Sequence, residues 1–394
     1  MNAGARTGQR GAALAALVGI GAASTAAHLG NNFTTYLVGG LIDRFGYGPL
    51  AMGAWNMAET LSYAAAMFVI APRARQLDAR VLAMVATMLV VVAQGASALV
   101  TTFPLLLLGR LGTGLGFGIM NSAVNLAAGR TAHPARAISL GITFQTVLFA
   151  GIALALPQVG QAHGVGGMFL ALAGLSLGLG LVALWLPGGT GEAPGSDTAT
   201  APAAPLGADG RRVLVAMALF AFGTLAIWPF IERTAHAIGV PATQFGRYQS
   251  LSVLSSAVGN ALLAAMLQRL PRALPLALAL GACGAACALL TTVSTGPAFG
   301  AALVAYNTCW FLTYALLLGL AYACESSGRL AVMTTGTWLL FQSLGSLAAG
   351  FIAQRFGGYA PIGPLGAVAC VMAIAVALPL ARRLDRTYTN LHCS

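Results

Sequence analysis

The chain has 394 residues, of which 58% are hydrophobic and only 7% are charged, and its mean hydropathy is +0.82. Soluble domains carry about 25% charged residues, so this composition excludes an ordinary soluble protein. The net charge is +11 and every cationic side chain is an arginine. Because these arginines are spread over short loops rather than gathered on one face, they do not indicate a nucleic-acid partner.

Apolar stretches long enough to cross a bilayer recur along the chain and predict an all-α integral membrane protein. We predict twelve transmembrane helices, at residues 12–39, 48–71, 81–102, 104–128, 137–158, 165–187, 213–236, 244–268, 273–294, 297–323, 329–352 and 361–381. A cleaved signal peptide is an alternative for the first stretch. A polar stripe that continues past it, followed by further spans, favours a membrane helix.

The spans fall into two groups of six. Residues 189–212 are rich in Gly, Ala, Pro and Thr without an apolar period, which predicts a flexible cytoplasmic linker between bundles at 1–188 and 213–394. Pro104 and Pro297 open the fourth span of each group, and Arg136 and Arg329 open the fifth; both pairs are 193 residues apart. This shared period predicts two pseudo-symmetric bundles.

Arginine placement predicts the orientation. Most of the 20 arginines fall in loops on the same side as the N-terminus, which the positive-inside rule places in the cytoplasm. We therefore expect a multi-pass protein of a bacterial cytoplasmic (inner) membrane with both termini in the cytoplasm. Arg233 and Arg247 are exceptions that lie in or beside apolar spans, as Arg110 does.

Several spans carry polar and aromatic residues at helical spacing, which predicts a shared polar face. Alternatively, these polar residues form hydrogen bonds between helices and have a purely structural role, worth roughly 0.6–2 kcal/mol per contact. The candidate substrate-binding residues are His28, Asn31, Asn32, Trp55, Asn56, Gln145, Trp228, Glu232, Gln249, Tyr306, Asn307, Trp310, Trp338 and Gln342.

Glu59 and Arg110 are the candidate proton-coupling residues. An ionisable side chain at membrane depth costs about 2.5–3.5 kcal/mol and marks a functional site by default. Arg110 stays cationic and needs a counter-charge, and Glu59 is the one acid deep in a span of the first group. We expect the two to pair, although Arg110 near the outer surface could instead extend its guanidinium to water.

Glu232 and Arg233 lie near the outer end of their span, after Pro229, which should kink it. Adjacent residues project about 100° apart on a helix, so we do not expect these two to pair. They form either a solvated helix end or an outer gate or substrate contact.

The run Arg110-x-x-x-Gly114-x-Gly116-x-Gly118 resembles the arginine–glycine motif in the fourth span of the major facilitator superfamily. The twelve spans, the two halves and the linker are similar to that family as well. Glycines two and four residues apart also predict close approach of neighbouring helices. The resemblance implies a secondary transporter in which two bundles rock about a midplane site, and it implies a proton-transfer role for this motif.

The chain departs from the family pattern at two places. The loop at 74–80 keeps only an acid and nearby arginines of the family's cytoplasmic motif, and its Asp78 and Arg80 are the candidate cytoplasmic gate. The run Gly39 to Gly46 fits that motif better, but it follows the first span, so we interpret it as a look-alike in an outer loop. The glycine–proline signature of drug exporters is missing, which favours uptake.

We therefore expect proton-coupled symport of a small organic solute with an anionic or aromatic part. A proton-antiport exporter of one metabolite or drug is the alternative, and a membrane sensor is a third hypothesis. An enzyme is not expected, because the histidines are scattered without catalytic partners. No nucleotide-binding loop, cofactor motif or complete metal-ligand set is present. The expected partners are the substrate, protons and lipid, with the protein acting as a monomer.

Overall fold

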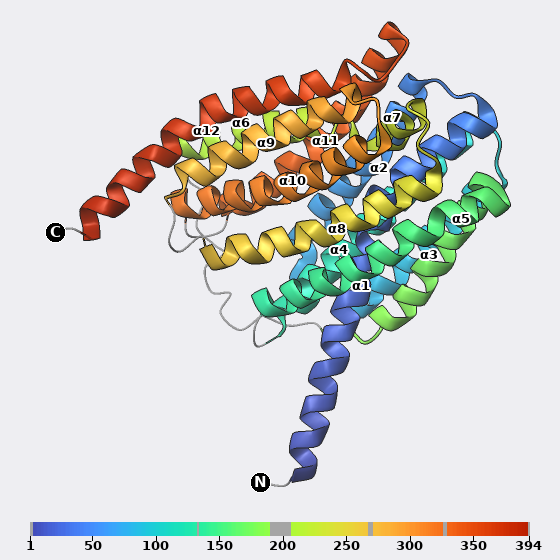
Figure 1. Cartoon of the computed structure of the whole chain (residues 1–394). Coiled ribbons are helices and arrows are strands. Elements are labelled where there is room, and N and C mark those ends of the chain that lie inside the picture. Colours follow the sequence, from blue (N-terminus) through green and yellow to red (C-terminus); the bar gives the residue numbers. More distant parts are fainter. Residues whose placement is uncertain (1–2, 132–133, 190–205, 267–270, 326–328, 393–394) are drawn as a thin grey trace. The chain divides into compact units, whose positions relative to one another are not determined.

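The computed structural model describes residues 3–131, 134–189, 206–266, 271–325 and 329–392, and within these ranges the chain is helical without a β-strand (Figure 1). Most of the predicted linker lies outside the described residues. The chain groups into two units. Unit 1 comprises Met1–Gly40 and Ala58–Pro202, and unit 2 comprises Leu41–Met57 and Ala203–Ser394. The end of the first helix and the start of the second therefore belong to unit 2, and the division into halves at 188 and 213 stays a prediction.

The helices of the first part of the chain are α1 (Ala3–Phe45), α2 (Pro49–Ile70), the short η1 (Ala71–Gln76), α3 (Ala79–Leu99), α4 (Phe103–Gly129) and α5 (Pro134–Ala183). In unit 1, α3 packs against α4 and α5. Helix α5 is broken at Gly164, whose φ of 64° is in the left-handed region that favours glycine. The break separates the two spans predicted at 137–158 and 165–187.

The remaining helices are α6 (Ala208–Thr224), η2 (Trp228–Phe230), α7 (Ile231–Ala237), α8 (Ala242–Met266), α9 (Ala273–Thr292), α10 (Gly296–Cys324), α11 (Arg329–Phe356) and α12 (Ile362–His392). Helix α12 packs on α6 and α9, α10 packs on α8 and α9, and α11 packs on α6. Helices α6, η2 and α7 together form the span predicted at 213–236. The interruption lies next to Pro229, so the predicted kink is confirmed.

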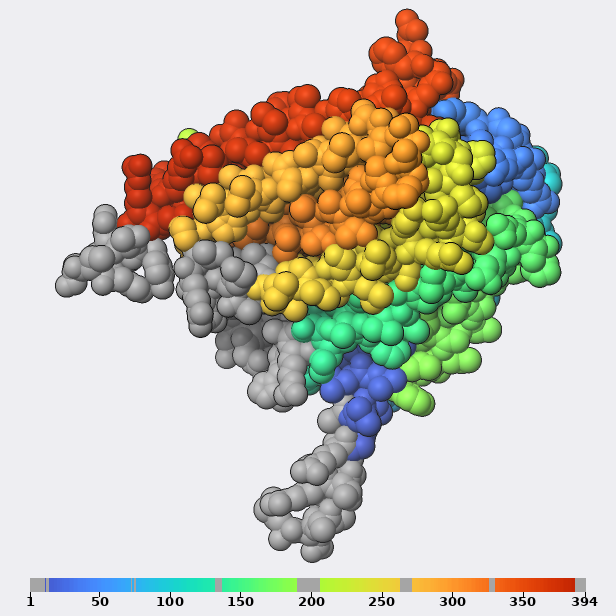
Figure 2. Space-filling model, in the orientation of Figure 1, coloured from blue at the N-terminus to red at the C-terminus, as the bar shows by residue number. Residues whose placement is uncertain are grey.

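Eight helical stretches among the described residues are long and apolar enough to cross a membrane. One of them, Ala137–Ala183, contains 47 residues, far more than the roughly 20 that a single span needs. With α5 providing two spans and α1, α2 and α8 added, the described helices account for each of the twelve predicted spans. Figure 2 shows α9 and α12 on one face of unit 2. Leu278 of α9 and Val371 of α12 are both exposed.

The glycines of α4 form two ridges that face different helices. A Cβ atom at Gly114 would overlap the carbonyl oxygen of Glu59, and one at Gly118 would overlap a carbonyl oxygen of the same helix, α2. A Cβ at Gly112 would lie 3.2 Å from Ala93 Cβ, and one at Gly116 would lie 2.5 Å from a methyl group of α3. The predicted close approach is confirmed, and it brings α2 against the segment of α4 that carries Arg110.

Candidate functional site

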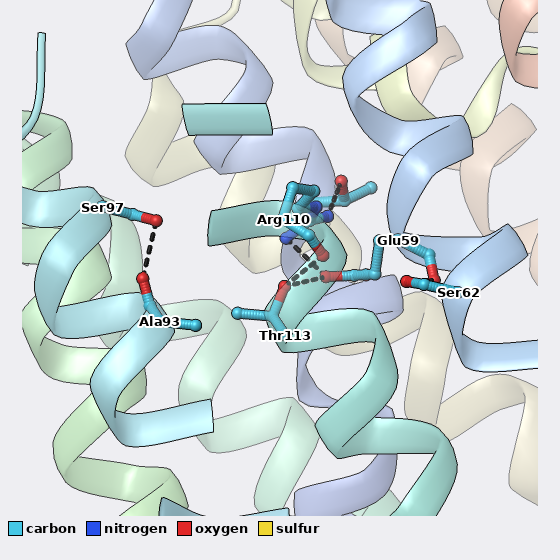
Figure 3. A network of polar contacts seen from close by, with 7 residues as sticks. Glu59, Ser62, Ala93, Ser97, Arg110 and Thr113 are labelled. Atoms are coloured by element: carbon cyan, nitrogen blue, oxygen red, sulfur yellow. Dashed lines mark hydrogen bonds and ion pairs between the residues drawn. The ribbon is translucent and has the colours of Figure 1, made fainter. Parts of the chain in front are cut away.

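A buried ion pair joins α2 and α4 in unit 1 (Figure 3). Arg110 Nη1 lies 2.7 Å from Glu59 Oε2, and each side chain is only 1% exposed. Arg110 Nη2 also donates to Thr34 Oγ1 of α1 at 2.5 Å. The predicted pairing of Glu59 with Arg110 is confirmed. The alternative in which Arg110 extends to water does not occur, because its guanidinium is buried among three helices.

Hydroxyl groups complete the environment of this pair. Thr113 Oγ1 lies 3.2 Å from Glu59 Oε2 and 2.9 Å from the carbonyl oxygen of Arg110 (Figure 3). Since a hydroxyl carries one proton, Thr113 donates to only one of these oxygens at a time. Glu59 Oε1 is buried and has no hydrogen-bond partner among the described residues. One carboxylate oxygen is thus fully engaged and the other remains open to a proton.

Helical spacing explains how these side chains meet. Gly30 and Thr34 are one turn apart on α1, as are Arg110 and Thr113 on α4, so each pair shares a face. A Cβ atom at Gly30 would lie 2.6 Å from both carboxylate oxygens of Glu59. A glycine at this position therefore makes room for the carboxylate. Sequence reasoning missed the two threonines, since hydroxyl residues are common in membrane helices and carry little signal.

Two other predicted residues of unit 1 are linked through Ser24. His28 Nδ1 lies 2.9 Å from the Ser24 carbonyl oxygen, and His28 Nε2 lies 3.4 Å from the hydroxyl of Tyr63. Ser24 Oγ donates to Gln145 Oε1 of α5 at 2.8 Å. An imidazole protonated on Nδ1 would donate to the carbonyl and accept from the tyrosine. This stripe of α1 connects α2 and α5.

The predicted asparagines of α1 are placed differently. Asn32 Nδ2 donates to the carbonyl oxygen of His28 in its own helix at 2.9 Å. Asn31 and Asn32 are both half-buried. The amide of Asn32 is therefore directed along α1 rather than toward the Glu59–Arg110 pair.

Three aromatic residues of α10 and α11 in unit 2, Trp310, Tyr314 and Trp338, form a cluster. The rings of Trp310 and Tyr314 stack with centroids 5.6 Å apart and an interplanar angle of 9°. The Trp338 ring lies 5.7 Å from Trp310 and 5.2 Å from Tyr314. The structure thus brings Trp310 and Trp338 together. Trp338 Nε1 is buried with no hydrogen-bond partner among the described residues.

The break after α6 anchors this cluster. Trp228 N bonds to the carbonyl oxygen of Leu225, which leaves the Thr224 carbonyl without its helical partner. Tyr306 OH donates to that carbonyl at 2.9 Å, and Trp310 Nε1 donates to Thr224 Oγ1 at 3.1 Å. The ring of Trp228 stacks on Tyr306 at 6.4 Å. Three predicted aromatic residues therefore meet at one helix interruption.

Buried amides lie near the same helices. Asn307 Nδ2 donates to Ser252 Oγ of α8 at 2.5 Å. Gln249, one turn earlier on α8, is 1% exposed, and its Oε1 has no hydrogen-bond partner among the described residues. Asn56 Nδ2 donates to Ser346 Oγ at 2.8 Å. The same Ser346 hydroxyl donates to the backbone carbonyl oxygen of Gln342, whose side chain is fully buried.

Asp43, Glu232 and Arg233 form an ion-pair cluster in unit 2. Arg233 Nη1 and Nη2 lie 2.7 and 2.9 Å from the two carboxylate oxygens of Asp43, which is a bidentate arrangement. Arg233 Nε lies 2.8 Å from Glu232 Oε2. The prediction that these adjacent residues do not pair is wrong, because the long arginine side chain can turn back toward its neighbour.

One interpretation of the outer segments needs correction. The run Gly39 to Gly46 is not an outer loop, since α1 continues to Phe45 and Asp43 lies in its last turn. Sequence reasoning missed Asp43 for this reason. Arg247 is exposed near the start of α8 and has no bonded acid among the described residues. Trp55, by contrast, is 1% exposed, as its place in a polar stripe suggested.

Asp78 and Arg80 hold together the end of α5 and the start of α3. Asp78 Oδ1 accepts from Arg80 N, and Asp78 Oδ2 accepts from Gly189 N at 2.5 Å. Arg80 Nε donates to the carbonyl oxygen of Leu186 at 2.7 Å. The Gly189 N–H and the positive charge of Arg130 keep the pKa of Asp78 below its ordinary value. These contacts all lie within unit 1.

The chain is similar to a known family of membrane proteins over most of its length. The family model described as Major Facilitator Superfamily matches residues 18–327. The chain belongs to the Major Facilitator Superfamily. It is accordingly a multi-pass membrane protein and a secondary transporter. The match covers the helices that carry Glu59, Arg110 and Trp310 and ends before α11, which carries Trp338.

Solved structures agree on the fold. A bacterial homologue of the human lysosomal transporter Spinster, crystallised in an inward-facing and unoccupied conformation, has 16% identity and a TM-score of 0.69 and covers 95% of this chain and 97% of its own. The nucleoside transporter NupG has 14% identity, a TM-score of 0.69 and coverages of 93% and 98%. The human organic anion transporter MFSD10 has 15% identity, a TM-score of 0.63 and coverages of 92% and 98%. No curated protein matches the chain.

Proposed function

We propose that the protein takes up a small organic anion with an aromatic part, together with a proton, across a bacterial cytoplasmic membrane in which both termini are cytoplasmic. The observation that carries the proposal is the buried ion pair of Glu59 and Arg110. Intramembrane ionisable residues mark proton and substrate pathways. The open Oε1 of Glu59 supplies a position for the proton.

The pair also suggests how proton and anion binding are coupled. Protonation of Glu59 removes its negative charge, while Arg110 stays cationic. The positive charge of Arg110 is then no longer balanced by Glu59, and it attracts an anionic solute. Release of the proton restores the ion pair and removes that attraction. Binding of either partner therefore favours binding of the other, as thermodynamic linkage requires.

The aromatic cluster supports the aromatic part of the substrate. Trp310, Tyr314 and Trp338 present stacking surfaces, and aromatic pairs contribute about 0.5–1.5 kcal/mol beyond area burial. The unpartnered Nε1 of Trp338 is a donor and the unpartnered Oε1 of Gln249 is an acceptor. Buried polar atoms of this kind favour a ligand that can satisfy them.

The coupling experiment uses the purified protein in liposomes with a pH gradient. Benzoate, cyclohexanecarboxylate and benzyl alcohol serve as probes, because they separate the aromatic ring from the carboxylate. Because benzoic acid crosses lipid unaided and collects on the alkaline side, accumulation is taken as the excess over protein-free liposomes under the same gradient. We expect this excess to be larger for benzoate than for the other two probes. Flux driven only by the opposite gradient would indicate export by antiport.

The matched variants are Glu59→Gln and Glu325→Gln, the second being an acid outside the cluster. Glu59→Gln should abolish gradient-driven accumulation while exchange of labelled for unlabelled probe persists. Glu325→Gln should retain accumulation. Full accumulation in Glu59→Gln would rule out the coupling role of this residue. Trp310→Ala with unchanged probe affinity would contradict the aromatic site.

A further inference from the structure

The arginine-bearing start of α6 and the second half of α12 enclose an open cavity of about 350 Å³ in unit 2. The two helices pack along each other. The residues that line the cavity are Arg211, Arg212, Val215, Ala375, Val376 and Pro379. Pro379 lies inside α12 and cannot donate to the carbonyl of Ala375, so one helical hydrogen bond is missing at the cavity wall. The lining is cationic at one end and apolar at the other.

The apolar end faces outward on the bilayer side. Val215 is 49% exposed on α6. On α12, Val368 and Val371 are 57% and 65% exposed and lie along the same helix as the lining residue Ala375. Exposed apolar residues in a membrane protein contact lipid tails. The cavity therefore lies where the hydrocarbon region gives way to charged side chains, and its occupant needs an apolar part and an anionic part.

Within the described residues, no acid compensates the positive charge of Arg211 and Arg212 at the other end. Neither guanidinium of Arg211 and Arg212 has a hydrogen bond or ion pair within the described residues, and both side chains are exposed. The acid nearest in sequence, Asp209, is bonded to Arg383. Asp385 accepts from the backbone N–H groups of Arg272 and Ala273 at the start of α9. The further arginines of this end of α12 are Arg382 and Arg386, both exposed.

We propose that this cavity binds an anionic phospholipid. The phosphate lies between the guanidinium groups of Arg211 and Arg212, and an acyl chain lies along Val215, Ala375 and Val376. Basic pockets between membrane helices bind anionic headgroups, and arginine forms paired hydrogen bonds to phosphate oxygens. A soluble anion would use the arginines but leave the apolar wall uncovered. The site is separate from the Glu59–Arg110 pair, which lies in unit 1.

The test is native mass spectrometry of the full-length protein in detergent, with phosphatidylglycerol and phosphatidylcholine of identical acyl chains. We expect phosphatidylglycerol to bind more tightly. Replacing both arginines with glutamine should weaken that binding roughly 10- to 30-fold, because each arginine near a membrane surface contributes about a fivefold gain. Arg355→Gln is the matched control, since Arg355 is an exposed arginine on α11. It should leave phosphatidylglycerol binding unchanged.

Two further measurements test the site without the double arginine variant, in case that variant folds poorly. Ala375→Trp keeps every charge but fills the apolar end, and it should reduce phosphatidylglycerol adducts. Glycerol 3-phosphate carries the anionic group without acyl chains and should neither bind measurably nor compete. Equal binding of both lipids, unchanged binding in the double variant or in Ala375→Trp, or effective competition by glycerol 3-phosphate would each overturn the assignment.

Discussion

Gly30 of α1 and the carboxylate of Glu59 approach so closely that a Cβ atom at position 30 would lie 2.6 Å from both carboxylate oxygens and would also overlap the Phe117 ring. Gly30→Ala should therefore destabilise the protein by about 1–3 kcal/mol through overpacking. Gly174→Ala in α5 is the control, because no described atom lies within 4 Å of its added Cβ. Thermal unfolding in detergent measures both, and equal melting temperatures would contradict the prediction.

The Asp43–Arg233 pair should contribute only modestly despite its bidentate geometry. The Asp43 side chain is 61% exposed, so solvent screens the attraction and a double-mutant cycle should give about 1 kcal/mol or less. Arg233→Ala should be more damaging than Asp43→Ala, because it removes the ion pair with the 7% exposed Glu232 side chain as well as the pair with Asp43. Raising the salt concentration should weaken the coupling between Asp43 and Arg233. Equal effects of the two alanine variants would contradict this asymmetry.

The hydrogen bond from Trp310 Nε1 to Thr224 Oγ1 should be measurable in the absence of substrate. Trp310→Phe removes the donor but keeps an aromatic ring, and it should cost about 0.5–1.5 kcal/mol of unfolding free energy. Trp338→Phe is the matched control, because Trp338 Nε1 has no partner among the described residues. Unfolding in mixed micelles should therefore show a smaller loss for Trp338→Phe than for Trp310→Phe.

Because the hydrogen bonds of Asp78 favour its ionised form, we expect the protein to lose stability in acid. The folded pKa of Asp78 lies below the ordinary value of 3.8, chiefly because Gly189 N donates to its carboxylate. The stabilisation is therefore complete above pH 3.8 and is lost as the pH falls through the lower, folded pKa. Asp78→Asn should unfold at a lower temperature than the parent protein near neutral pH, and the difference should shrink below about pH 4. A difference that stays constant down to pH 3 would contradict the assignment.

The sequence predicted the Glu59–Arg110 pair because few ionisable residues lie at membrane depth, so each has few possible partners. It also predicted the two glycine ridges of α4, since their contacts follow from helical spacing. Asp43 was missed because its glycine-rich context indicated a loop. The Tyr306–Thr224 contact depends on a carbonyl released by a helix break, and no residue pattern specifies which carbonyl that is.

The separation of Glu59 and Arg110 along the chain has a consequence for biogenesis. They are 51 positions apart, and translation proceeds at about 5–20 residues per second, so α2 leaves the ribosome roughly 3–10 seconds before its arginine partner. During that interval the glutamate has no guanidinium to neutralise it. We therefore expect α2 either to stay at the insertion machinery until α4 arrives or to enter the bilayer with Glu59 protonated.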